Sequence, residues 1–138
     1  MIQVWFTLVP ATILLSRAAA AQTHSVPCAD SKTTKSGVYT PQQAIRGKDV
    51  YAGSCKSCHT PESHTGATFN ATWNKRSLAE LYGFIRDRMP KNEPGSLSAQ
   101  EYTDVLAYLL RMNRMPSGRT ELPADSTAMK NIRIEIVK

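Results

Sequence analysis

Cys55-Lys56-Ser57-Cys58-His59 is the stretch of this sequence that constrains the fold most strongly. Two cysteines three positions apart at the end of a helix can each add to one vinyl group of a porphyrin. The histidine beside the second cysteine then points its imidazole at the iron and binds it as an axial ligand. We therefore expect Cys55 and Cys58 to hold one haem c covalently and His59 to ligate its iron.

Two other interpretations of the five residues are weaker. A structural zinc site needs a second pair of ligands, and the chain offers no other Cys-x-x-Cys pair and no suitable pair of histidines. His64 alone is not enough, and we expect it to be an exposed loop residue. A redox-active dithiol of the thioredoxin type needs a strand–helix setting, which the surrounding sequence does not predict.

The N-terminus has the pattern of an export signal. An apolar run over residues 4–15 is interrupted by polar residues and is too short to span a bilayer. It is followed at 18–21 by four alanines, the small residues that signal peptidase accepts. We predict a signal peptide over residues 1–21, cleaved after Ala20 or Ala21, a periplasmic location, and no stable membrane insertion after cleavage. The alternative is an uncleaved anchor helix.

The rest of the chain divides into three parts. Residues 22–38 are rich in Ser, Thr, Lys and Pro without apolar periodicity, which predicts a flexible leader. Cys28 lies in this leader and is expected to be free or to form an intermolecular bridge. Residues 39–122 are the predicted domain, and residues 123–138 a tail that packs on it or extends from it.

The charge of the chain limits its partners. There are 17 Lys and Arg against 11 Asp and Glu, so the formal net charge is +6. Two haem propionates would make the working protein only mildly basic, which favours an acidic protein partner. No dense Lys/Arg cluster with interleaved aromatic residues is present, so nucleic acid is not an expected partner.

Three segments have the pattern of a capped helix start, in which a hydroxyl residue is followed three positions later by an acid or an amide. They are Thr40-Pro41-Gln42-Gln43, Ser77-Leu78-Ala79-Glu80 and Ser98-Ala99-Gln100-Glu101. Loops are expected over residues 60–74 and 89–97. The alternating run 132–136 predicts a short strand or a tail laid over the surface. The expected domain is all-α.

The second axial ligand decides what a haem can do, and four methionines are candidates: Met89, Met112, Met115 and Met129. A methionine sulfur raises the potential and fills the position that oxygen or peroxide would need. Met89 precedes a proline in the loop between the second and third helices, so it can swing over the haem face opposite His59. Met115 also precedes a proline but follows the last helix. The remaining alternative is that all four fill gaps in the core. We favour Met89.

These features give the chain a resemblance to a known family. The motifs that carry it are Gly47-x-x-x-Tyr51, the five residues from Cys55 to His59, Phe69-x-x-x-Trp73, Met89-Pro90, Pro94-Gly95-Ser96-Leu97-Ser98 and Asp104 to Leu110. From Thr40 to about Leu122 the chain resembles a class I c-type cytochrome. It is most similar to the cytochrome domains and subunits of periplasmic quinoprotein (quinohaemoprotein) alcohol dehydrogenases.

The resemblance implies a fold and a pair of ligands. It implies three main helices around one covalent haem, with irregular loops and an extended C-terminal tail. The first and third helices should cross, with Gly47 close to Tyr108 or its neighbours. His59 and Met89 should be the axial ligands of the iron.

Four further residues are possible parts of a haem pocket: Tyr51, Phe69, Trp73 and Arg86. Trp73 either donates its indole N–H to a propionate, walls the pocket, or is an ordinary core tryptophan. Arg86, with Arg88 and Lys91, either pairs with propionates, forms a rim for an acidic partner, or belongs to a solvated helix face.

The expected function is electron transfer rather than catalysis. The leading hypothesis is a periplasmic one-electron carrier of a respiratory chain, which takes electrons from a quinoprotein-type dehydrogenase and passes them to a terminal oxidase or another cytochrome. One alternative is a cytochrome subunit fixed in a dehydrogenase complex. A second is a haem enzyme with an open sixth site, against which Met89 argues.

Overall fold

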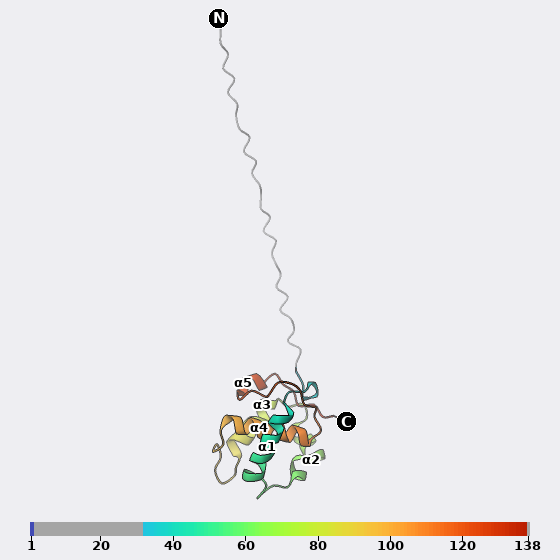
Figure 1. The fold of residues 1–138 in the computed structure, drawn as a ribbon. Helices are drawn as coiled ribbons and strands as arrows, with labels where there is room; N and C mark the ends of the chain where they lie inside the picture. The colour runs from blue at the N-terminus through green and yellow to red at the C-terminus, as the bar shows by residue number, and fades with distance from the viewer. Residues whose placement is uncertain (2–31, 138) are drawn as a thin grey trace.

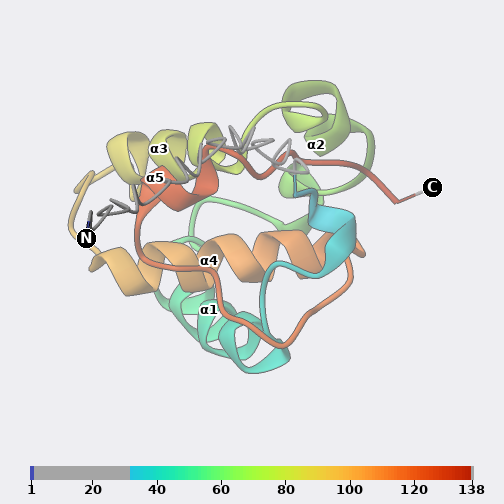
Figure 2. The same ribbon diagram turned by 90° about the horizontal axis from the view of Figure 1, so that it is seen from above.

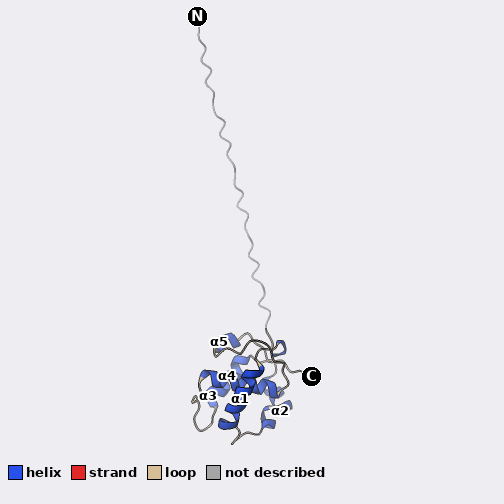
Figure 3. Cartoon of the chain, in the orientation of Figure 1, coloured by secondary structure: helices blue, strands red, loops and turns tan. Residues whose placement is uncertain are grey.

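The computed structural model describes Met1 and residues 32–137. Within that part the chain is mostly helical, as Figures 1 and 3 show, and it forms two isolated β-bridges but no strand. None of the described helices has the length and hydrophobicity needed to span a bilayer. The elements are η1 (Thr34–Ser36), α1 (Pro41–Ser54), η2 (Pro61–His64), α2 (Gly66–Trp73), α3 (Leu78–Arg88), α4 (Ala99–Met112) and α5 (Ser126–Met129).

The three predicted helix starts are confirmed. The hydroxyl of Thr40 accepts from the backbone N–H of the third helical residue of α1, at 3.1 Å. Ser77 and Ser98 each form a capping box, in which Glu80 and Glu101 return a hydrogen bond to the cap. Local sequence therefore fixes where the main helices begin, because each cap satisfies backbone donors that the helix leaves free.

Helix α4 lies at the centre of the fold. Figure 2 shows α1 along one side of it, and α3 with α5 along the other. Almost every residue of α4 from Tyr102 to Leu110 is buried. The fully buried leucines of the core are Leu78, Leu106, Leu110 and Leu122.

The crossing of α1 and α4 depends on Gly47. A Cβ atom at this position would lie 1.7 Å from the carbonyl oxygen of Asp104 and 2.9 Å from the amide nitrogen of Val105. The contact is thus one turn before Tyr108, among the neighbours named by the resemblance. Arg46, the preceding residue, joins the same elements through its guanidinium, which donates to Asp104 at 2.8 Å and to Glu121 at 2.8 Å.

The segment predicted to be a loop, residues 60–74, is largely helical, so that prediction was wrong. It contains η2 and α2. Thr65 stands at the N-cap of α2 but makes no side-chain capping bond. The helix instead turns Phe69 and Trp73, four residues apart, into the core, where burial of the two aromatic rings stabilises it.

The C-terminal segment contributes to the core. Ile134 is fully buried, and its backbone N–H donates to the carbonyl of Arg76 at 2.9 Å. On the other side Arg133 donates to the carbonyl of Lys32 at 2.8 Å. Thr34 is also fully buried. The packed part of the chain therefore extends beyond both ends of the predicted 39–122 domain. Cys28 and all of the predicted signal peptide except Met1 lie outside the described residues.

Candidate cofactor site

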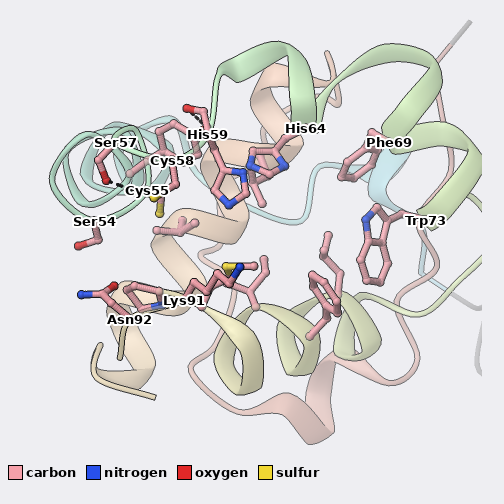
Figure 4. Close-up of a pocket in the computed structure, with 18 residues that line it drawn as sticks. Ser54, Cys55, Ser57, Cys58, His59, His64, Phe69, Trp73, Lys91 and Asn92 are labelled. Atoms are coloured by element: carbon pink, nitrogen blue, oxygen red, sulfur yellow. Dashed lines mark hydrogen bonds between the residues drawn. The ribbon is translucent and has the colours of Figure 1, made fainter. Parts of the chain in front are cut away.

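A cleft opens between the end of α1, the turn η2 and helices α2, α3 and α4 (Figure 4). It holds about 1010 Å³ of space free of protein atoms, part of it open to solvent. Its walls are mainly apolar, and the lining includes Tyr51, Cys55, Cys58, His59, His64, Phe69, Trp73, Leu81, Phe84, Ile85, Met89, Val105 and Leu109.

Cys55, Cys58 and His59 come together because α1 ends here. Cys55 is the C-cap of α1, and its carbonyl accepts from the N–H groups of Cys58 at 3.1 Å and His59 at 3.0 Å. This turn directs all three side chains to one wall of the cleft. Both thiols are free; Cys55 is half-buried and Cys58 exposed. Burial raises the pKa of the Cys55 thiol.

Met89 reaches the same cleft from another element. It caps the C-terminus of α3, and its N–H donates to the carbonyl of Ile85 at 2.8 Å. Its own carbonyl accepts from the hydroxyl of Tyr102 at 2.8 Å, which ties this loop to α4. Met89 is the one candidate methionine that lines the cleft; Met112, Met115 and Met129 pack elsewhere against or within the core.

The four possible pocket residues are not all brought together. Tyr51, Phe69 and Trp73 line the cleft, whereas Arg86 does not. The guanidinium of Arg86 donates to the neighbouring Asp87 at 2.8 Å on the exposed face of α3. The ring of Trp73 contacts Phe84, with 5.4 Å between the ring centroids.

His64 is not the exposed loop residue that the sequence predicted; that expectation was wrong. It is half-buried, lines the cleft, and its ring centroid lies 4.6 Å from that of His59. Burial, and then the neighbouring His59, lower the pKa of His64. The amide of Asn113 donates to the His64 carbonyl at 2.8 Å and so holds this residue in place. No local pattern signals this, because Asn113 is 49 residues away.

The residues present fit a covalent haem. Two free thiols stand at the required spacing on one wall, with an imidazole beside the second. The walls are apolar, as a buried porphyrin requires, and a methionine sulfur belongs to the same cleft. Cys55 and Cys58 would hold the cofactor, which agrees with the expected haem c.

Comparison with known proteins supports this assignment. Residues 42–109 match the family model described as cytochrome c oxidase, cbb3-type, subunit III. Searches of curated proteins and of solved structures gave no significant match. The matched segment includes α1 apart from its first residue, the Cys55–His59 motif, Met89 and most of α4. The chain carries a c-type cytochrome domain with the all-α class I fold and one covalent haem c, and it is an electron-carrier protein.

Proposed function

We propose that this chain is an exported one-electron carrier whose haem iron is held by His59 and Met89. The observation that carries the proposal is that Met89, alone among the four candidate methionines, lines the cleft that contains Cys55, Cys58 and His59. When bound there, haem supplies the ferric–ferrous couple of one-electron chemistry. A thioether sulfur on the iron stabilises the ferrous state and leaves no position for oxygen or peroxide.

The chain's own residues give such a site its rigidity. Helix α4 holds both sides of the cleft, because Tyr102 in its first turn binds the carbonyl of Met89 and Asn113 at its C-cap binds the carbonyl of His64. Both are hydrogen bonds to backbone, so they fix the loops rather than the ligand side chains. An electron carrier needs fixed loops, because loops that stay in place in both oxidation states keep the structural change on electron transfer small.

The cellular setting follows from the sequence. The proposed signal peptide, residues 1–21, supports a periplasmic location. We propose redox proteins as partners, with a quinoprotein-type dehydrogenase as donor because of the motifs shared with such cytochromes. The matched family is described as part of a cbb3-type oxidase, which supports a terminal oxidase as acceptor. A basic carrier should form small, salt-sensitive encounters with acidic partners.

The same family match supports a second candidate, a cytochrome subunit that stays in an oxidoreductase complex. The free carrier and the complex subunit differ in how firmly the chain binds its partner proteins. Co-purification with a dehydrogenase or an oxidase through high salt would favour the subunit, whereas release by salt would favour the carrier.

The ligand proposal is tested by the absorption spectrum of the oxidised protein. A weak band at the red end of the visible spectrum reports a methionine sulfur on ferric haem iron. We expect it in the parent and in Met115→Leu, and we expect its loss in Met89→Leu. Leucine keeps the volume of each site and removes only the sulfur, so the two variants are matched. Loss of the band in Met115→Leu and its survival in Met89→Leu would overturn the proposal.

A further inference from the structure

The ring of His59 lacks the support that an iron-binding histidine ordinarily has. Such a histidine normally donates its second ring N–H to a carbonyl, a carboxylate or water, and this bond fixes the orientation of the ring. Within the described residues, neither ring nitrogen of His59 makes a hydrogen bond to the protein. Its bonds are made by the backbone: the N–H donates to the Cys55 carbonyl at 3.0 Å, and the carbonyl accepts from the Tyr51 hydroxyl at 3.5 Å. Any group of the protein that orients this ring must therefore do so through packing.

The neighbouring ring is His64. The two imidazole centroids are 4.6 Å apart and the ring planes are inclined by 54°, so the rings are in van der Waals contact at a tilt. The ring of Tyr51 also packs against His64, with 6.0 Å between the ring centroids and the planes almost perpendicular. Figure 4 shows His59 and His64 side by side at the top of the cleft. Rotation of the His59 ring towards this side would meet His64.

His64 is itself held in place. It ends the short turn η2, which packs against α4. The amide of Asn113 donates to the His64 carbonyl at 2.8 Å and to the Leu109 carbonyl at 2.9 Å, which joins the turn to the end of α4. The backbone of the turn is therefore braced against the central helix of the fold, and the His64 ring that it carries can act as a stop.

We propose that His64 is a positioning residue: its ring packs against the imidazole of His59 and fixes the orientation of that imidazole on the haem iron. Its contact replaces the hydrogen bond that would otherwise orient the ligand. Asn113 acts one step further out, since it holds His64 and does not touch His59. The inference rests on the proposed role of His59 as an axial ligand.

Electron paramagnetic resonance of the oxidised, haem-loaded protein tests it, because the g values of low-spin ferric haem depend on the orientation of its axial ligands. The parent should give one sharp low-spin signal. His64→Ala should broaden this signal or divide it into several, because the ligand ring then takes several orientations. His64→Phe keeps a ring of similar size and should restore the single signal. Asn113→Ala should give an intermediate broadening.

Ser63→Ala is the matched control. It removes the hydrogen bond, 2.6 Å long, from the Ser63 hydroxyl to the Thr60 carbonyl inside the same turn, and it keeps the His64 ring. The signal of this variant should therefore equal that of the parent. Equal signals in the parent and His64→Ala would overturn the proposal, as would a failure of His64→Phe to restore the signal. Loss of the low-spin signal in both His64 variants would mean that His64 is itself a ligand. The proposed function is tested separately by the sulfur–iron band of the parent, which should be present in all these variants.

Discussion

Substitution of Gly47 by alanine should separate the two helices that carry the site. The new Cβ atom would lie 1.7 Å from the carbonyl oxygen and 2.3 Å from the carbonyl carbon of Asp104. Observed Cβ contacts are essentially never shorter than 3.0 Å, so the backbones must move apart by at least 1.3 Å. Because both atoms belong to the backbone of α4, no rotation of a side chain can relieve the clash.

The cost of this substitution is the sum of two opposing effects. Overpacking of a well-packed core costs about 1–3 kcal/mol, and a backbone clash belongs at the upper end, about 3 kcal/mol. Alanine regains about 1 kcal/mol of helix propensity over glycine. The net loss in the free energy of unfolding should therefore be about 2 kcal/mol or more, a large part of the roughly 5–15 kcal/mol that stabilises a typical domain.

Helix α1 supplies its own control. Gly53 lies in the same helix, and a Cβ atom there would meet nothing within 4 Å. Gly53→Ala should therefore stabilise the protein by about 0.5–1 kcal/mol. Guanidinium unfolding of the haem-loaded variants, followed by circular dichroism, measures both values. Equal stability of Gly47→Ala and Gly53→Ala would refute the steric role of Gly47.

Three further perturbations test other parts of the fold by the same unfolding assay. Asp104→Asn should cost about 1–2 kcal/mol, since it weakens the charge-assisted bonds from Arg46 at a side chain only 5% exposed; an unchanged midpoint would contradict this. The pKa of Glu80 is lowered to about 2, mainly by the backbone N–H of the Ser77 cap. The ionised Glu80 therefore stabilises the folded protein fully above pH 4.5, and this stabilisation is lost as the pH falls to about 2. Glu80→Gln should therefore lose less stability than the parent over that range, and equal slopes would refute the capping argument. Ile134→Ala should cost about 2–5 kcal/mol and Val137→Ala almost nothing, because the first side chain is fully buried and the second 41% exposed; similar values would contradict the packing of the C-terminal segment.

The parts of the fold that were predictable from sequence are those with local causes. The caps at Thr40, Ser77 and Ser98 each act within three residues, and the three main helices begin where these caps predict. The spacing of Cys55 and Cys58 is likewise local, and it led to the haem. The matched family model supports that cofactor.

The features that were missed have distant causes. Helix α2 has a glycine start and no side-chain cap, and burial of Phe69 and Trp73 stabilises it. His64 stands in a polar turn, and its position depends on Asn113 at the far end of α4. A sequence pattern read over ten or fifteen residues does not contain these partners. For Arg86 the sequence left open a propionate partner, a rim for an acidic protein and a solvated helix face; its side chain lies on the exposed face of α3.

The most direct test of the central claim, that Met89 closes the haem to outside ligands, is carbon monoxide binding by the reduced protein. Carbon monoxide needs a free iron position, so the parent should bind it slowly or not at all. Met89→Ala should bind it rapidly, and Met112→Ala, whose side chain lies outside the cleft, should behave as the parent does. Rapid binding by the parent, at the rate of Met89→Ala, would contradict the claim.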